Sequence, residues 1–131
     1  MKAAAAQTVR LTLPVIPLRL DTELAARPML EGLLAGLFAA NGETHAIGDP
    51  VDWLTHPSGY IEWHIVLHKF YHAPGLVQAF AETGDARYVA LFERHVRSWI
   101  AAVEPGFIAA DVTGRRIQNW VMALSLYTAL P

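Results

Sequence analysis

The sequence predicts an all-α domain of tandem helical hairpins, and three observations support this prediction. Apolar residues recur at helical spacing on both sides of a short polar turn at residues 83–85. Trp63 and Trp120 are separated by about the length of two helical hairpins, so each is expected near the start of an equivalent helix. No run of residues alternates between apolar and polar as a strand would.

The N-terminal residues 1–20 are expected to form an irregular lead-in to a helical domain that covers residues 21–131. Pro14 and Pro17 interrupt this segment, and no helical period runs through it. Its short alanine run is broken by polar residues before it reaches the length of a signal peptide. The residues therefore leave the localisation of the protein unknown.

A first helix is expected after Asp21 or Thr22, either of which can cap its amino end. Its apolar positions continue to Asn41 and Gly42, a pair that is typical of a helix stop. Pro28 leaves two alternatives, because it either kinks this helix or marks its true start.

A long ordered loop is predicted over residues 43–59, which are rich in Gly, Pro, Asp and His and contain Trp53. A second helix then covers residues 60–82. Pro74 removes one backbone donor from it, so we expect a kink at residues 70–73.

A third helix is expected over residues 86–103, with Asp85 as its cap. Thr113 is placed to cap a fourth helix, with Arg115 and Arg116 in its first turn. Two cations at this end oppose the helix dipole. We therefore expect at least one of them to pair with a carboxylate of the protein or of a ligand.

Composition excludes some functions and indicates a partner. The net charge is −2 and no run of Lys or Arg is present, so nothing supplies the positive surface that nucleic acids require. No segment has the roughly 20 apolar residues of a membrane span. Hydrophobic residues make up 53% of the chain and charged residues 17%. Such an apolar domain is expected to bury surface against another subunit or against the remainder of a longer chain.

Several short motifs together resemble the N-terminal helical region of heparinase II/III-like polysaccharide lyases, over about residues 30–131. They are VDW at 51–53, EW at 62–63, LHKF at 67–70, TGDARY at 83–88, SWI at 98–100 and RIQNW at 116–120. The family tends to have Asn, Arg and His where this chain has His68, Lys69 and Phe70, so a polar cluster that faces the ligand is only partly kept.

The resemblance implies a fold and a substrate class. Proteins of that family are similar in having an incomplete α/α toroid followed by a β-sandwich, and they cleave uronate-containing polysaccharides by β-elimination. The residues with catalytic roles lie beyond the RIQNW segment and would follow Pro131. The implied function is therefore to frame or bind an acidic polysaccharide, without a cofactor and without activity of this chain alone. A periplasmic or secreted location is implied only by the family.

Arg116, Asn119 and Trp120 lie on neighbouring positions of one predicted helix. As a binding site, Arg116 would pair with a sugar carboxylate, Asn119 would bond a hydroxyl group and Trp120 would stack on a sugar ring. The alternative is structural: Trp120 packs in the core and Arg116 pairs with Glu62 or Asp111. Lys69 carries the same two interpretations.

Trp53 and the histidines add further candidates. Trp53 either fills a cleft or presents a surface for stacking. His64, His68 and His72 would share one face of an unkinked helix, a spacing that can ligate a metal, but no carboxylate accompanies them. We expect these histidines to be buried or at a rim, and no metal site. His68 also remains a candidate for substrate binding.

A second function stays open beside the first. The chain is either part of a polysaccharide lyase or a stand-alone helical module that dimerises or docks on another protein.

Overall fold

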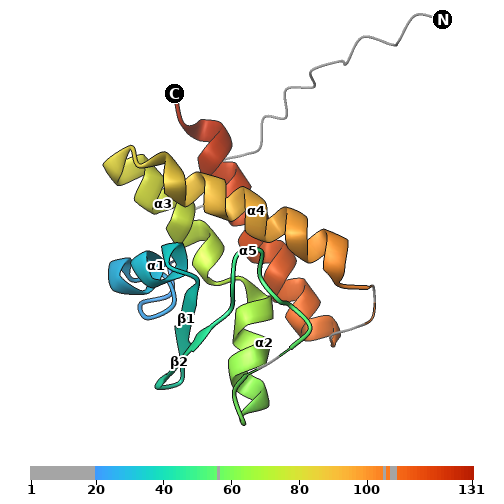
Figure 1. Cartoon of the computed structure of the whole chain (residues 1–131). Coiled ribbons are helices and arrows are strands. Elements are labelled where there is room, and N and C mark those ends of the chain that lie inside the picture. The colour runs from blue at the N-terminus through green and yellow to red at the C-terminus, as the bar shows by residue number, and fades with distance from the viewer. Residues whose placement is uncertain (1–19, 56, 105, 107–108) are drawn as a thin grey trace, which may run out of the picture.

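The structure is a computed structural model that describes residues 20–55, 57–104, 106 and 109–131. These residues form a mostly helical domain that includes five helices and a small two-stranded antiparallel hairpin (Figure 1). The helical class is confirmed, whereas the prediction that no strand occurs was wrong. The elements in chain order are α1 (Arg27–Leu34), β1 (Leu37–Ala40), β2 (Glu43–Ala46), α2 (Ile61–Lys69), α3 (His72–Thr83), α4 (Ala86–Ala102) and α5 (Ala110–Ala129).

The start of α1 is set by its proline. The side chain of Asp21 accepts hydrogen bonds from the backbone N–H groups of Glu23 and Leu24, so it stabilises a turn that precedes the helix. Pro28 lies in the first turn of α1, where its missing N–H leaves no helical bond unmade. Of the two alternatives for Pro28, the structure therefore shows the true start. Of the predicted lead-in at residues 1–20, residues 1–19 fall outside the described residues.

The β1–β2 hairpin replaces the predicted end of the first helix. Gly36 has a φ of 78°, a left-handed conformation that ends the helical path just after α1. Asn41 and Gly42 have φ values of 53° and 76°, so both residues of the two-residue loop are left-handed. This conformation matches the twist of a hairpin and is favoured by an Asn-Gly pair. The pair is thus a strand connection and not a helix stop.

The predicted second helix is two helices. Phe70 has a φ of 58° and its N–H bonds to the carbonyl of Leu67, which ends α2. Pro74 then lies in the first turn of α3, where backbone N–H groups have no partner within the helix. The helix is therefore fully interrupted between Lys69 and His72, whereas only a kink at residues 70–73 was predicted.

The third helix was predicted well and the fourth less so. Asp85 caps α4 by accepting a hydrogen bond of 3.0 Å from the N–H of Arg87. By contrast, the N–H of Thr113 already bonds to the carbonyl of Ala109, so Thr113 lies within α5 and does not cap it. The two arginines that follow Thr113 are consequently in the second turn of α5, where the helix dipole acts on them less.

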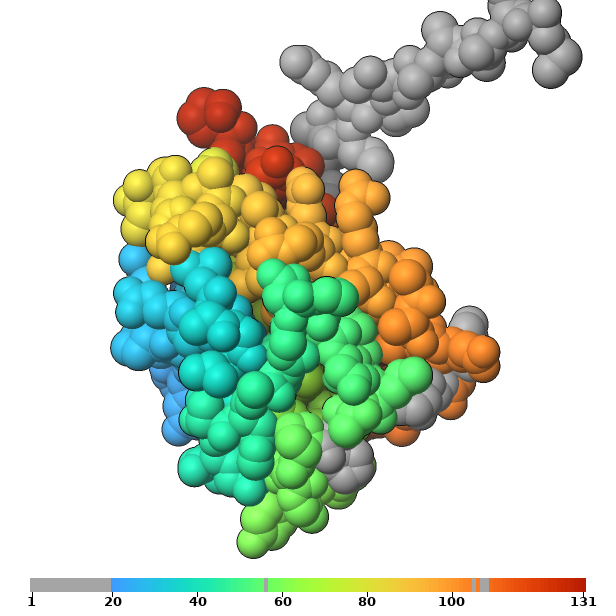
Figure 2. Space-filling model, in the orientation of Figure 1, coloured from blue at the N-terminus to red at the C-terminus, as the bar shows by residue number. Residues whose placement is uncertain are grey.

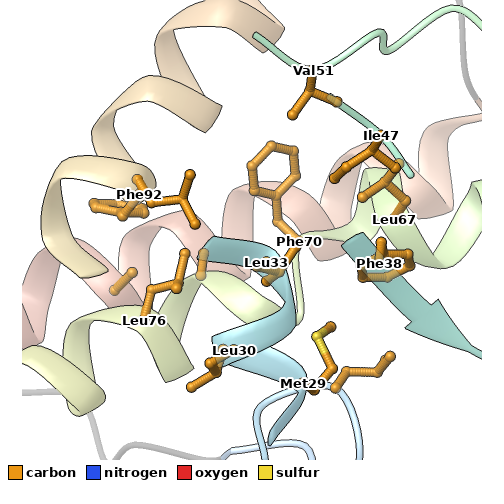
Figure 3. Packing of buried hydrophobic residues seen from close by; sticks show 14 of the residues in the cluster. Met29, Leu30, Leu33, Phe38, Ile47, Val51, Leu67, Phe70, Leu76 and Phe92 are labelled. Carbon is orange, nitrogen blue, oxygen red and sulfur yellow. The ribbon is translucent and has the colours of Figure 1, made fainter. Parts of the chain in front are cut away.

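The core lies where α3 packs against α1, α4 and α5. Phe70, at the break between α2 and α3, is fully buried, and apolar side chains of α1, β1, α2 and α4 surround it (Figure 3). The hairpin covers α2, because Trp63 packs edge-on against Phe38 and donates a hydrogen bond to the carbonyl of Glu43. Within the described residues, no helix has both the length and the apolar character to cross a membrane.

Candidate functional site

Arg116 on α5 is a buried cation with unused hydrogen-bond donors. The residue is 5% exposed, and its guanidinium carbon lies 3.7 Å from the ring centre of Trp99 and 5.6 Å from that of Trp120. Its Nη2 is 3.4 Å from the hydroxyl oxygen of Thr113, a long contact. Nε and Nη1 lie beneath the surface and have no partner within the described residues. Within the part of the chain that the structure describes, the guanidinium therefore lies against aromatic rings and has no ion-pair partner.

The charge of Arg116 persists despite this burial. Desolvation lowers the pKa of the guanidinium from its ordinary value. That ordinary value is so high that the group remains protonated at neutral pH. The indole faces of Trp99 and Trp120 partly offset the lost hydration through cation–π attraction. Within the described residues, neither Glu62 nor Asp111 forms an ion pair with Arg116, so the predicted structural pairing is not present.

His68 lies in the same region and is held in one tautomer. The indole Nε1 of Trp99 donates to its Nδ1 at 2.9 Å, so the proton of the neutral ring is on Nε2, which donates to the carbonyl of Trp53 at 2.9 Å. Burial, together with the nearby His64 and Arg116, lowers the pKa of His68 to about 4, although the hydrogen bond to the carbonyl of Trp53 opposes this shift. His68 is therefore neutral at physiological pH.

Three helices, α2, α4 and α5, supply this group of side chains. His64 precedes His68 by one turn of α2, and the centres of the two rings are 4.3 Å apart. Arg116 and Trp120 are one turn apart on α5, and Trp120 contacts Trp99 of α4 edge-on. We refer to the set of His64, His68, Trp99, Arg116 and Trp120 as the Arg116 cluster.

Trp53 fills a cleft and does not present a free face. It is 1% exposed, it stacks on Phe70 with ring centres 5.2 Å apart, and its Nε1 donates to the hydroxyl of Ser98 on α4. Figure 2 shows the loop that carries it, in green, lying against the orange part of α4. Because His68 bonds to its carbonyl, Trp53 fixes this loop to the Arg116 cluster.

Asn119 and Lys69 connect α5 to α2. The side-chain amide of Asn119 donates to the backbone carbonyl of Lys69 at 2.8 Å, which satisfies a carbonyl at the end of α2. Asn119 is buried, so this bond aligns the two helices that carry Arg116 and His68. The side chain of Lys69 is half-buried, and in the described part of the chain it forms no ion pair.

The three histidines proposed as one helical face are separated by the break at Phe70. His72 belongs to α3, and its Nε2 lies 3.2 Å from Nδ1 of His95 on α4. Burial lowers the pKa of both rings, that of His95 to about 4. With both ring nitrogens of His68 already bonded, the three residues do not form a common ligand face. Within the described residues, no group of His, Asp and Glu is arranged to hold a metal ion.

Of the residues singled out in the sequence, the fold therefore brings His68, Arg116 and Trp120 into one cluster, with Trp53 behind them. Trp99 was not among the candidate binding residues of the sequence, although its ring lies under the guanidinium and its N–H sets the tautomer of His68. A signal was available, because Trp99 follows His95 by one helical turn on the apolar face of α4.

Comparisons with protein-family models, with curated proteins and with solved structures gave no match. The resemblance to heparinase II/III-like lyases therefore rests on the sequence motifs, and the chemical interpretation of the Arg116 cluster rests on its own geometry. A guanidinium that lies between two indoles and has no ion pair among the described residues is suited to an oxyanion carried on a molecule with an apolar face.

Proposed function

We propose that this chain is the N-terminal helical part of a heparinase II/III-like polysaccharide lyase, in which the Arg116 cluster binds a uronate sugar. In this proposal the helices belong to an incomplete α/α toroid, and the residues that perform β-elimination lie outside the chain. The motif resemblance supports the family, and the helical hairpin of α3 and α4, joined by the turn before Asp85, is consistent with tandem hairpins.

The observation that carries the proposal is that Arg116 is buried while two of its nitrogen donors, Nε and Nη1, have no partner among the described residues. A buried cation whose donors lack partners is costly for a fold, and the cost falls when an anion supplies the missing acceptors. A carboxylate accepts two parallel hydrogen bonds from a guanidinium. The carboxylate of a uronate is attached to a ring whose C–H face can contact Trp99 or Trp120, so one sugar satisfies both parts of the cluster.

Reaching the guanidinium requires a movement. Nε and Nη1 of Arg116 lie beneath the surface, so a ligand has to displace a neighbouring side chain. Trp120 is half-buried, and its Nε1 has no partner among the described residues, so rotating its ring breaks no hydrogen bond to any of them. We therefore expect uronate binding to change the fluorescence of Trp120.

The other residues have supporting roles in this proposal. Trp53 fixes the loop and Asn119 aligns α5 with α2, so neither contacts the sugar directly. His68 orients Trp99 under the guanidinium. Lys69 remains a candidate for a second acidic sugar, because its ammonium group has no ion pair within the described residues.

The test is calorimetric titration with a uronate oligosaccharide and with the same oligosaccharide after its carboxyl groups are reduced to alcohols. We expect binding only to the charged form. Arg116→Gln should weaken it about tenfold to hundredfold, because a charge-assisted hydrogen bond contributes about 1.5–3 kcal/mol. Arg115→Gln is the matched control, since Arg115 is exposed and, among the described residues, donates to Gln118 and lies over the face of Tyr71.

Equal affinity for the charged and reduced oligosaccharides would refute the proposal. So would equal weakening by Arg115→Gln and Arg116→Gln, because the effect would then reflect general charge. Circular dichroism of each variant establishes that its helices are intact.

A further inference from the structure

A hollow of about 300 Å³ lies between α4 and α5. Both helices pack on α3, and the apolar side chains of Phe92, Val96 and Trp120 line the space between them. Two charged residues of α4, Glu93 and Arg97, also line it. The hollow thus combines an apolar lining with one acidic and one basic group.

Exposed apolar residues continue from this hollow along α5. Ile117, Val121 and Leu124 are spaced as one side of a helix and are 51%, 38% and 42% exposed. Ile100 of α4, at 61% exposure, adjoins the hollow, which Leu124 also lines. We refer to these four residues and the hollow as the α4–α5 face. No charged residue occurs in the sequence from Ile117 to Pro131, so a partner that covers this part of α5 would not have to desolvate a charged side chain of the helix.

The two charged residues beside the hollow form no ion pair within the described chain. Glu93 and Arg97 are one turn apart on α4, and the ion pairs of the described residues involve neither of them. Oppositely charged groups one turn apart become self-complementary when two identical helices lie antiparallel. In that arrangement each glutamate faces the arginine of the other helix.

We propose that the α4–α5 face binds the same face of a second copy of this chain, related by a twofold axis near Val96. In this dimer an exposed side chain of one copy, from Ile100, Ile117, Val121 or Leu124, enters the hollow of the other copy. This is possible because the exposed side chains and the hollow belong to the same face. Glu93 of each copy pairs with Arg97 of the other. The face carries both the exposed side chains and the hollow that receives them, and both charges of the ion pair. Such a self-complementary surface favours an identical partner over an unrelated protein.

Sedimentation velocity over a range of concentrations tests this inference. We expect the mass to rise towards twice that of one chain as concentration increases. Leu124→Glu should weaken the dimer at least tenfold, because it places a carboxylate in the apolar contact. Leu37→Glu is the matched control: Leu37 has a similar exposure, 39%, but lies on β1, away from the face, and this variant should dimerise as the original chain does.

A charge exchange identifies the occupant more sharply. Glu93→Arg and Arg97→Glu should each weaken the dimer, since each places like charges opposite one another. The double variant should restore it, because the exchanged pairs are complementary again. Both residues are exposed, so these variants are expected to fold.

A single-chain mass at the highest soluble concentration would overturn the inference and would leave the face to another part of a longer chain or to a different protein. Failure of the double variant to restore a dimer that both single variants weaken would overturn the twofold arrangement. Equal weakening by Leu37→Glu and Leu124→Glu would place the contact elsewhere. None of these outcomes depends on uronate binding.

Discussion

Acidification from pH 7 to pH 5 protonates histidines and leaves most carboxylates charged, so it tests the buried rings selectively. His68 and His95 are 0% and 2% exposed, and burial lowers the pKa of each to about 4. His72, which shares a hydrogen bond with His95, shifts in the same direction. In the unfolded chain each ring returns to its ordinary pKa of 6.5.

The sign follows from where the protons bind. Between pH 6.5 and 4 the unfolded chain takes up protons that the folded chain excludes, so stability is complete above this window and is lost as the pH falls through it. A difference of 2.5 pKa units corresponds to about 3 kcal/mol for each of His68 and His95 once pH 4 is reached. Between pH 7 and pH 5 the two together account for about 3–4 kcal/mol. That is a large share of the roughly 5–15 kcal/mol by which a small domain is stable.

Urea unfolding at pH 7, 6 and 5, followed by tryptophan fluorescence, measures this loss. We expect the midpoint to fall at each step, and His95→Gln to remove only part of the dependence, because one of the three buried rings is gone while His68 and His72 remain. The hydrogen bonds that Asp52 and Asp85 accept keep the pKa of each carboxyl below its usual 3.8. These carboxyl groups therefore stay charged between pH 7 and pH 5 and do not contribute to the measured loss. An unfolding free energy that stays constant from pH 7 to pH 5 would refute the buried, neutral state of these histidines.

Two substitutions test the helices that carry the site. Gly75→Ala should destabilise the fold by about 1–3 kcal/mol in urea unfolding, because its Cβ would lie 2.7 Å from that of Ala25 and 3.3 Å from Leu30. A gain, as helix propensity alone favours, would contradict this close approach of α3 to the turn before α1. Asp85→Ala should cost about 1 kcal/mol, because the N–H of Arg87 loses its acceptor at the start of α4. No loss in the same assay would mean that the cap contributes nothing.

The helices were predictable where local signals agreed with packing. Asp85 begins α4 as a cap, and the apolar period of that helix includes the buried Tyr88 and Phe92, although Ile100 is 61% exposed. The break between α2 and α3 was placed near Phe70, but its extent was not evident, because Phe70 adopts a left-handed conformation that its side chain disfavours. Tertiary burial of this ring, at 0% exposure, stabilises a backbone that local sequence does not predict.

The β-hairpin was missed because its strands have only four residues each, too few for an alternating pattern to stand out. The Asn41-Gly42 pair was read as a helix stop, although the same pair is also the strongest short signal for a hairpin turn. The signal was present in the sequence and the wrong alternative was chosen.

Three of the residues singled out in the sequence lie together in the structure, but not with the partners expected for them. His68, Arg116 and Trp120 converge, but the partner of the cation was sought among carboxylates such as Glu62, whereas the structure places the face of Trp99 against it. Sequence spacing relates positions within one helix. It does not reveal which ring of another helix covers a guanidinium, because that depends on how α4 and α5 pack on α3.

The most direct test of the proposed function is the ¹H–¹⁵N NMR signal of the Arg116 Nε–H, assigned by its loss in Arg116→Lys and followed during titration with the uronate oligosaccharide. We predict a progressive downfield shift of this proton that saturates with binding, because an unpartnered donor acquires a carboxylate acceptor. The carboxyl-reduced oligosaccharide should leave it unchanged. A saturable shift of other signals with the Arg116 Nε–H unmoved would contradict the account, because the sugar would then bind elsewhere.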